Sequence, residues 1–240
     1  MCETCGCQEA VALHQQEDSK RKIELEEKVL SKNDRLAERN RGVFEAMKVV
    51  VVNLVSSPGA GKTTLLERTI RELKSEMTIG VIVGDQQTDR DAKRLEATGV
   101  KAHQINTIDA CHLDAQMIRH SLDQFSLSEF NLLFIENVGN LICPGAFDLG
   151  EDFRVVVLAT TEGEDKPLKY PGIFLDSQLV LLNKMDLVGV LKVDPDQCLS
   201  FVKRVNPLSP ALCVSARTGE GMDKWYDWLR KKVMEKKDIG

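Results

Sequence analysis

The stretch at residues 49–64, VVVVNLVSSPGAGKTT, constrains the fold of this chain more than any other. Seven mostly β-branched or apolar residues run into a turn of small residues, and the helical pattern LLERTIRELK follows. A strand, a tight glycine turn and a helix start make up a phosphate-binding loop. Gly59 and Gly61 let the backbone curl, so that consecutive N–H groups point at one anion and the helix N-terminus adds partial positive charge.

Within such a loop, Lys62 reaches the β- and γ-phosphates and the Thr63 hydroxyl binds Mg²⁺. Ala60 and Thr64 complete the predicted nucleotide contacts. The strict pattern has glycine at position 56, where this chain has Ser56. We interpret the stretch as a variant phosphate loop rather than a glycine turn of another α/β protein, because the flanking strand and helix stand where the mechanism needs them.

Composition indicates an ordinary globular chain. Its 240 residues are 42% hydrophobic and 29% charged, enough for one α/β domain with an appendage. The net charge of −5 gives no overall attraction to nucleic acid or to an anionic membrane. The sequence has neither an apolar run long enough to span a bilayer nor a signal-peptide core, so we expect a cytoplasmic protein.

Strand and helix patterns alternate after the phosphate loop, which predicts a three-layer α/β fold with a mostly parallel sheet of about seven strands. A metal-binding tail and linker (1–17) and N-terminal helices (18–48) precede this nucleotide-binding domain (49–240). The patterns predict one or two amphipathic helices in 18–48, broken near Ser31–Asp34 and at Asn40–Gly42. These helices either pack on the domain or serve dimerisation. The later strands are expected within 78–85, 100–106, 131–140, 153–167, 177–188 and 211–216.

The chain begins MCETCGCQ, with Cys2, Cys5 and Cys7 in a C-x-x-C-x-C pattern. This spacing turns three sulfurs onto one centre, and thiolates favour zinc, nickel, Cu(I) or cobalt. The alternative is a disordered tail with adventitious thiols. A thioredoxin-like redox pair is disfavoured because no strand precedes the motif.

Two acidic residues end predicted strands. Asp85 closes the second strand, where ligands bind in open α/β sheets. Glu136 closes the fourth, in ENVG, where nucleotide hydrolases usually have Asp-x-x-Gly to sense Mg²⁺ and the γ-phosphate. Cys143 follows Gly139 by four residues, and Cys111 and His112 are expected in the first turn of a helix over 107–125. The sequence therefore places a thiol on the segment that responds to the γ-phosphate.

The sharpest specificity signal is Asn183-Lys184-Met185-Asp186 at the end of the sixth strand. The Asp186 carboxylate accepts hydrogen bonds from guanine N1–H and the exocyclic amine, a donor pair that adenine lacks. Asn183 braces the loop, the Lys184 stem lies over the base, and a backbone N–H from Ser215-Ala216 supports the base. The pattern favours GTP over ATP.

Together these motifs resemble those of the HypB family of hydrogenase-maturation GTPases, which belong to the dimerising branch of phosphate-loop GTPases. The resemblance spans nearly the whole chain. It is carried by CETCGC, SSPGAGKTT, Cys111-His112, ENVGNLICP, EGEDKPLKYPGIF and NKMD.

The resemblance implies a GTPase that binds GTP and GDP with Mg²⁺ and delivers Ni²⁺ to a hydrogenase large-subunit precursor, with other maturation proteins as partners and GTP-dependent homodimerisation. It implies a tight nickel site at Cys2, Cys5 and Cys7, and a second Ni²⁺ or Zn²⁺ site at the dimer interface. It also gives roles to the following residues: Cys111, His112 and Cys143 at the second metal site; Lys62, Thr63 and Thr64 at the phosphates and Mg²⁺; Asp85 and Glu136 around Mg²⁺; and Lys166 at the partner's nucleotide.

Three alternatives stay open. A GTPase chaperone for another nickel enzyme, such as the urease accessory GTPase, would lack the C-x-x-C-x-C start. A nickel or zinc storage protein would need GTP only secondarily. A translation or signalling GTPase is disfavoured because it has no need of thiol sites. For the second metal site, the alternative is that Cys111 and Cys143 are buried core thiols. No glutamine is placed to orient the attacking water, so a slow intrinsic hydrolysis rate is expected.

Overall fold

The computed structural model describes residues 7–85, 89–107 and 110–238, and for residues 7–24 and 26 the helical backbone alone. The strands are β1 (Val50–Ser56), β2 (Ile79–Asp85), β3 (Lys101–Asn106), β4 (Leu132–Glu136), β5 (Phe153–Ala159), β6 (Leu179–Asn183) and β7 (Ala211–Cys213). The helices are α1 (Cys7–Ala46), α2 (Lys62–Leu73), α3 (Arg90–Glu96), α4 (Ala115–Leu122), α5 (Cys143–Ala146), α6 (Lys166–Lys169), α7 (Pro171–Leu175), α8 (Val188–Leu191), α9 (Pro195–Val205) and α10 (Met222–Asp238).

The seven strands form one sheet in the order β3-β2-β4-β1-β5-β6-β7, and each neighbouring pair is parallel. This confirms the predicted three-layer fold with a parallel sheet of seven strands. Every residue of β1 is buried. A strand buried on both faces needs a nearly continuous apolar run, which explains the VVVVNLV pattern of this central strand.

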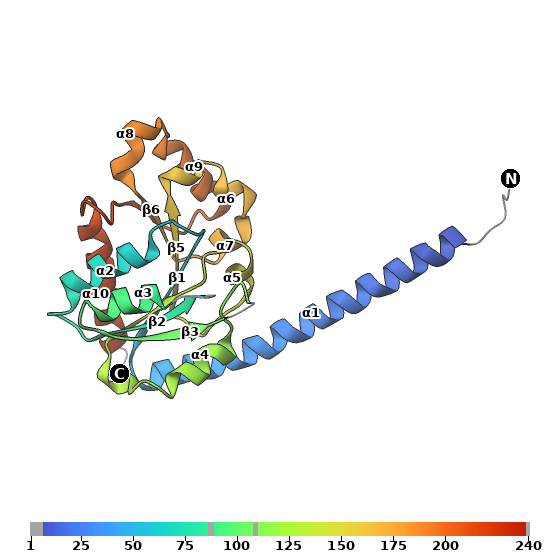
Figure 1. Ribbon diagram of the computed structural model, residues 1–240, viewed down its shortest axis with the longest axis horizontal. Coiled ribbons are helices and arrows are strands. Elements are labelled where there is room, and N and C mark those ends of the chain that lie inside the picture. The colour runs from blue at the N-terminus through green and yellow to red at the C-terminus, as the bar shows by residue number, and fades with distance from the viewer. Residues whose placement is uncertain (1–6, 86–88, 108–109, 239–240) are drawn as a thin grey trace.

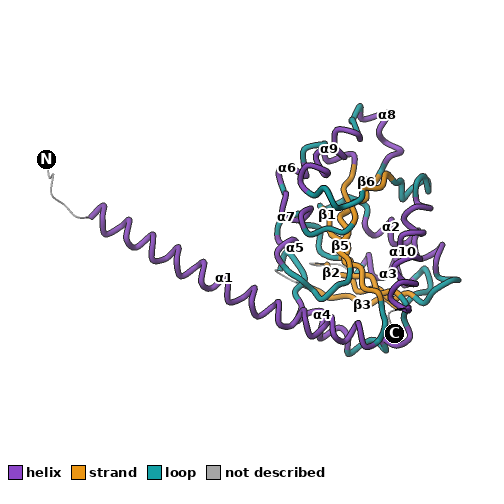
Figure 2. The backbone as a smooth tube through the Cα atoms, turned by 180° about the vertical axis from the view of Figure 1, so that it is seen from behind, coloured by secondary structure: helices purple, strands orange, loops and turns teal. Residues whose placement is uncertain are grey.

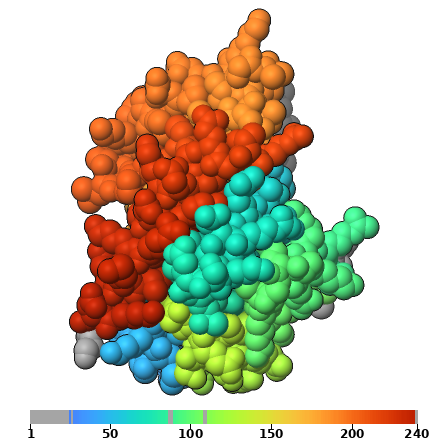
Figure 3. Space-filling model, turned by 90° about the vertical axis from the view of Figure 1, so that its left-hand side faces the viewer, coloured from blue at the N-terminus to red at the C-terminus, as the bar shows by residue number. Residues whose placement is uncertain are grey.

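Helices cover both faces of the sheet (Figures 1 and 2). On one face, alternate β1 residues such as Val52 and Leu54 pack with α2, α3 and α10 in one buried cluster. Figure 3 looks onto this face, where α2 lies between α10 and α3. On the other face, Val51 packs with α1 and α4, and Val55 packs with α7 and α9. The alternation follows from the two-residue period of a strand.

Helix α1 is one unbroken helix of 40 residues. Its C-terminal part lies along α4, and its N-terminal part projects from the body of the molecule (Figures 1 and 2). The part of the predicted 1–17 tail and linker that the structure describes is helical from Cys7 on, and the predicted breaks near Ser31–Asp34 and Asn40–Gly42 are wrong. The reason is that Asn33 and Asn40 are buried and bond to other segments, so they neither cap nor end a helix.

The predicted position of Cys111 and His112 in a first helical turn is also wrong. Both residues lie in a bend, and α4 begins three residues after His112, at Ala115. Asp114 sets this start, because its carboxylate accepts a 2.7 Å hydrogen bond from the Met117 N–H and so caps the helix. The bend leaves both metal-ligand candidates free of helical geometry.

Among the residues that the structure describes, no helix is both long and apolar enough to cross a membrane.

Candidate nucleotide and metal site

The turn between β1 and α2 has the backbone of a phosphate-binding loop. Gly59 and Gly61 have φ of 75° and 98°, in the left-handed region that favours glycine. A Cβ at Gly61 would lie 2.7 Å from Asn183 Nδ2, so the loop also packs too closely against the β6 end for any larger residue. Helix α2 starts directly after Gly61 and directs its free N–H groups at the turn.

Lys62 is buried, and its ammonium donates a 2.8 Å hydrogen bond to the Ser56 hydroxyl. Burial lowers the pKa of Lys62. Ser56 is the residue that departs from the strict loop pattern. Its hydroxyl holds the lysine inside the loop, which gives the departure a structural role.

A cavity of about 480 Å³ opens beside this loop and β2. It gathers most of the predicted phosphate and Mg²⁺ contacts: Gly59, Gly61, Lys62, Thr63, Thr64, Asp85 and Glu136. Asp91, Arg94 and Asn137 also line it and were missed from the sequence. The i, i+3 spacing of Asp91 and Arg94 at the start of α3 was the available signal.

The Thr63 hydroxyl donates a 2.7 Å hydrogen bond to Glu136 Oε1, whereas the buried Glu136 Oε2 has no partner among the described residues. Burial raises the pKa of Glu136 to about 7. A buried carboxylate oxygen left without a donor suits a cation at this point of the cavity. The donor set of Thr63, Asp85 and Glu136 is all oxygen, which is the set that Mg²⁺ prefers.

The NKMD loop joins the other side of the phosphate loop. The Asn183 side chain donates to Ala60 O at 2.9 Å and accepts from the Ala216 N–H at 3.0 Å. Lys184, at φ 64°, donates to Gly59 O at 2.7 Å. The Ser215 hydroxyl donates to Asp186 Oδ1 at 2.6 Å and so orients this carboxylate.

The N–H groups of Ser215 and Ala216, which are expected to support the base, are bonded within the protein in this structure, and their contact with the base stays a prediction. The Ser215 N–H donates to Glu220 O at 2.8 Å, and the Ala216 N–H is already bound to Asn183. Both residues also follow β7, which ends at Cys213, rather than belonging to it. Their role in this structure is to hold Asp186 and Asn183.

Lys166 begins α6, and its ammonium lies 5.3 Å from the centre of the Tyr170 ring. It does not line the cavity beside the phosphate loop. A contact between Lys166 and the nucleotide of a partner chain stays a prediction.

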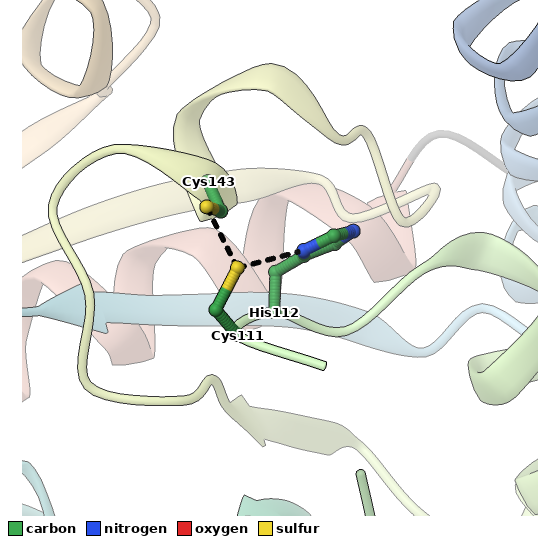
Figure 4. A group of neighbouring side chains, drawn as sticks. All are labelled: Cys111, His112 and Cys143. Atoms are coloured by element: carbon green, nitrogen blue, oxygen red, sulfur yellow. Dashed lines mark hydrogen bonds between the residues drawn. The ribbon is translucent and has the colours of Figure 1, made fainter. Parts of the chain in front are cut away.

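Three metal-ligand candidates meet at one point. The sulfurs of Cys111 and Cys143 are 2.8 Å apart, and His112 Nδ1 is 3.6 Å from the Cys111 sulfur (Figure 4). One ligand atom from each of the three residues lies within 4.8 Å of the others. Two sulfurs and one imidazole nitrogen form a donor set for nickel, zinc or a similar borderline metal.

Charge at this cluster depends on protonation. Cys111 and burial together raise the pKa of the Cys143 thiol. Burial lowers the pKa of His112, whose ring stacks on Phe147 with 3.9 Å between the centroids. The imidazole is therefore neutral near pH 7 and can bind a metal, while Cys143 must lose a proton first.

Other histidine and cysteine residues of the described chain do not belong to this cluster. His103 packs edge-on against Phe125, and Cys198 is buried in the core beside α9. Cys2 and Cys5 lie outside the described residues. Cys7 begins α1, but its side chain is likewise outside them.

A chain of buried hydrogen bonds connects the metal cluster with the end of β4. The Leu113 N–H, next to His112, donates to Asn137 Oδ1 at 3.2 Å. Asn137 Nδ2 donates to Asn53 Oδ1 at 3.3 Å, and Asn53 Nδ2 donates to Glu151 Oε1 at 2.9 Å. Asn137 directly follows Glu136, so the chain starts beside the nucleotide cavity.

The chain continues through Arg154 to the segment that carries Cys143. Arg154 pairs with the buried Glu151 carboxylate at 3.0 Å and donates to Gly145 O and Phe147 O, each at 3.0 Å. Burial alone would raise the pKa of Glu151, but Arg154 and the bond from Asn53 outweigh it and lower this pKa. Both ligand-bearing segments are thus tied to one buried polar network.

Fold and site together define a P-loop nucleotide-binding protein with a thiol and imidazole cluster that is connected to its nucleotide cavity through Asn137. Residues 50–212 match the family described as CobW/HypB/UreG, nucleotide-binding domain. The hydrogenase maturation factor HypB of Azotobacter vinelandii is 54% identical over 212 residues, which are 88% of this chain and 70% of that protein.

Two solved structures are also similar, each with a TM-score of 0.80 and each covering 85% of this chain. One is the hydrogenase maturation factor HypB from Archaeoglobus fulgidus, which is 42% identical in sequence and is matched over 99% of its own length. The other is HypB from Helicobacter pylori in complex with nickel, which is 38% identical in sequence and is matched over 96% of its own length. The chain belongs to the HypB family of hydrogenase maturation factors, as its motifs indicate.

Proposed function

We propose that this protein is a GTP-hydrolysing nickel metallochaperone, which binds Ni²⁺ and delivers it to a [NiFe]-hydrogenase precursor. The observation that carries the proposal is the Cys111–His112–Cys143 cluster, whose donor atoms lie within 4.8 Å of one another. Cys143 stands on the segment that leads from Glu136, at the nucleotide cavity, and the Cys111–His112 bend is tied to the same segment through the Leu113 N–H and Asn137 Oδ1. A metal held there is within reach of changes at the γ-phosphate.

Guanine selection is assigned to Asp186. The Ser215 hydroxyl holds one carboxylate oxygen at 2.6 Å, which fixes the direction in which the carboxylate faces the base. An adenine base offers no matching pair of donors and would leave the carboxylate without partners. GTP and GDP are therefore the proposed nucleotides.

Hydrolysis is proposed to rest on positioning and charge. Lys62 and the N–H groups around Gly59 and Gly61 meet the negative charge on the transferring phosphoryl group. Thr63 and Asp85 would hold Mg²⁺ here, and the ion would supply positive charge to the phosphate oxygens. Glu136 accepts the hydrogen bond from the Thr63 hydroxyl and so fixes the orientation of this side chain.

Coupling between nucleotide and metal is proposed to run through the residues after Glu136. A shift of Asn137 with the γ-phosphate would move the Leu113 N–H that it binds, and with it the adjacent His112. Hydrolysis would so change the geometry of the cluster and favour metal release to a partner. Energetically, the nucleotide states must differ in metal affinity for this to occur.

The remaining parts of the proposal follow the family resemblance. GTP binding would bring two chains together, with Lys166 reaching the partner's nucleotide and the two clusters adjacent at a two-fold axis, where they take Ni²⁺ or Zn²⁺. Cys2, Cys5 and Cys7 would form a separate nickel site. The partners would be the hydrogenase large-subunit precursor and other nickel-handling maturation proteins.

The test is a Ni²⁺ titration of the GDP-loaded and GTP-analogue-loaded protein, each with and without Cys143→Ala. Replacement of the three tail cysteines isolates the cluster, and Cys198→Ala is the matched control because Cys198 lies in the core. We expect Cys143→Ala to abolish binding and the two nucleotides to give different affinities or release rates. Equal affinities and rates in the two nucleotide states would contradict the coupling.

A further inference from the structure

The C-terminal part of α1 carries two buried asparagines on one face, two turns apart. Asn33 is 5% exposed and Asn40 is fully buried, and they alternate with apolar residues such as Ala37 and Phe44 on the packed face. Asparagine disfavours a helix interior, and a buried amide is costly unless it is hydrogen-bonded. Packing alone would be served better by leucine at both positions. The hydrogen-bond partners of the two amides should therefore explain why asparagine stands at these positions.

Asn33 bonds to both segments that carry the metal-ligand candidates. Its Oδ1 accepts a 2.9 Å hydrogen bond from the Ala115 N–H, three residues after His112. Its Nδ2 donates a 2.8 Å hydrogen bond to Asp148 O, five residues after Cys143. One side chain of α1 thus bridges the two segments.

Asn40 makes the same kind of bridge two turns later. Its Nδ2 donates to Ala115 O at 2.9 Å and to Leu149 O at 3.1 Å. The two asparagines therefore hold both backbone polar groups of Ala115 and two consecutive carbonyls of the other segment. We call Asn33 and Asn40 the asparagine clamp.

Neighbouring residues fix the same segment to α1. Arg41 donates to Glu151 O at 2.8 Å and pairs with the Asp148 carboxylate at 2.5 Å. Gly150 has φ of 90°, and a Cβ there would lie 2.5 Å from Ala37 O. The chain after Cys143 thus touches the α1 backbone so closely that a shift of α1 must move it.

From this geometry we propose that α1 positions the metal cluster: the asparagine clamp holds the Cys111–His112 bend and the Cys143 segment side by side, so that one metal can take ligands from both. The proposal rests on the metal site proposed above. Asn33 and Asn40 are positioning residues, since neither reaches the metal.

The first experiment measures the separation of the two thiols without any metal. A short bifunctional alkylating reagent links Cys111 to Cys143, and peptide mass spectrometry follows this product in the full chain. We expect Asn33→Leu and Asn40→Leu to slow the link at least several-fold. Arg39→Ala, on the exposed face of the same helix, should leave the rate unchanged.

The second experiment uses Co²⁺ as the probe, with the tail cysteines replaced. The visible spectrum of bound Co²⁺ reports its coordination geometry. We expect the leucine variants to change this spectrum and to weaken binding about tenfold, while GDP affinity stays as in the parent protein. Asn33→Asp, which keeps only the acceptor, should give an intermediate effect.

The two readouts separate the clamp from the proposed function. Cross-linking rates and Co²⁺ spectra equal to those of the parent protein would overturn the clamp and leave the metal site intact. Absence of Co²⁺ binding to the parent cluster would contradict the proposed function, and the cross-linking rates would still decide the clamp. If a leucine variant fails to fold, Arg41→Ala tests the same attachment, because Arg41 is only half-buried. It should slow the link as well.

Discussion

The Thr63 hydroxyl donates a 2.7 Å hydrogen bond to Glu136 Oε1 and so joins the start of α2 to the end of β4. The second oxygen of Glu136 is buried without a partner among the described residues. The pair brings together the phosphate loop and the strand end that precedes the metal segment. Burial of the carboxylate, rather than the bond from Thr63, raises the pKa of Glu136 and makes it sensitive to pH.

Stability of the nucleotide-free protein should fall as pH rises through about 7. Burial raises the pKa of Glu136 from 4.5 to about 7, so its contribution is complete below about 4.5 and is lost as pH passes the folded-state value. The full effect is about 3 kcal/mol. Urea unfolding between pH 5 and 8, without Mg²⁺ or nucleotide, measures it.

Glu136→Gln should remove this part of the pH dependence and be more stable than the parent at pH 8. Glu129→Gln changes an exposed glutamate and serves as the control. A Glu136→Gln variant whose stability follows pH just as the parent's does would contradict the assignment.

Asp186→Asn should change the base preference of the protein from guanine to xanthine. The amide cannot accept two hydrogen bonds from guanine, but its Nδ2 can donate to the extra carbonyl of xanthine. We expect GDP affinity to fall at least about tenfold and affinity for xanthosine diphosphate to rise. Competition with a fluorescent nucleotide measures both. Ser215→Ala, which only frees the carboxylate, should give a smaller loss, and unchanged GDP affinity in Asp186→Asn would refute the role.

Metal affinity of the cluster should rise with pH. The raised pKa of Cys143 means that a metal must displace a proton from this thiol near pH 7, whereas the lowered pKa of His112 leaves the imidazole already neutral. Zn²⁺ titrations between pH 6.5 and 8, with the tail cysteines replaced, should show tighter binding at higher pH. Proton release measured in weakly buffered solution is the independent check, and flat affinity across this range would speak against thiol ligation.

Asn137→Ala should weaken the dependence of metal affinity on the nucleotide. The change removes the bonds to Leu113 and Asn53, so the Cys111–His112 bend no longer follows the end of β4. GDP affinity should change little. Asn137→Asp keeps the acceptor for Leu113 and should retain more of the coupling. The measurement is the ratio of Ni²⁺ affinities in the GTP-analogue and GDP states, and a ratio unchanged in Asn137→Ala would exclude this route.

Sequence patterns predicted the parts of the structure whose interacting residues are neighbours in the chain. The apolar run of β1, the glycine turn and the start of α2 follow one another in sequence, so their arrangement could be predicted together with the parallel sheet. The NKMD loop was found in the same way. Cys111, His112 and Cys143 came together as the family resemblance implied, although the bend that presents the first two was expected to be a helix.

Sequence reasoning failed where a residue acts on a distant segment. Asn33 and Asn40 have low helix propensity and were interpreted as breaks, but their partners lie 75 or more positions away along the chain. Ser56 departs from the strict loop pattern, and its bond to Lys62, which that pattern does not describe, accounts for the departure. Asn53 interrupts the apolar strand β1 because its side chain bonds to Glu151 and Asn137. The hydrophobic pattern of β1 gives no sign of these distant partners.

The length of α1 has a consequence for the route of a metal between the two proposed sites. At a rise of about 1.5 Å per residue, Cys7 lies about 39 Å along the helix from Asn33, which bonds next to the cluster. The five residue steps from Cys2 to Cys7 can span roughly 18 Å at most. While α1 stays intact, the tail thiols of one chain therefore cannot touch the cluster of the same chain. Passage of an ion between them needs a second molecule, so its rate should increase with the concentration of protein or carrier.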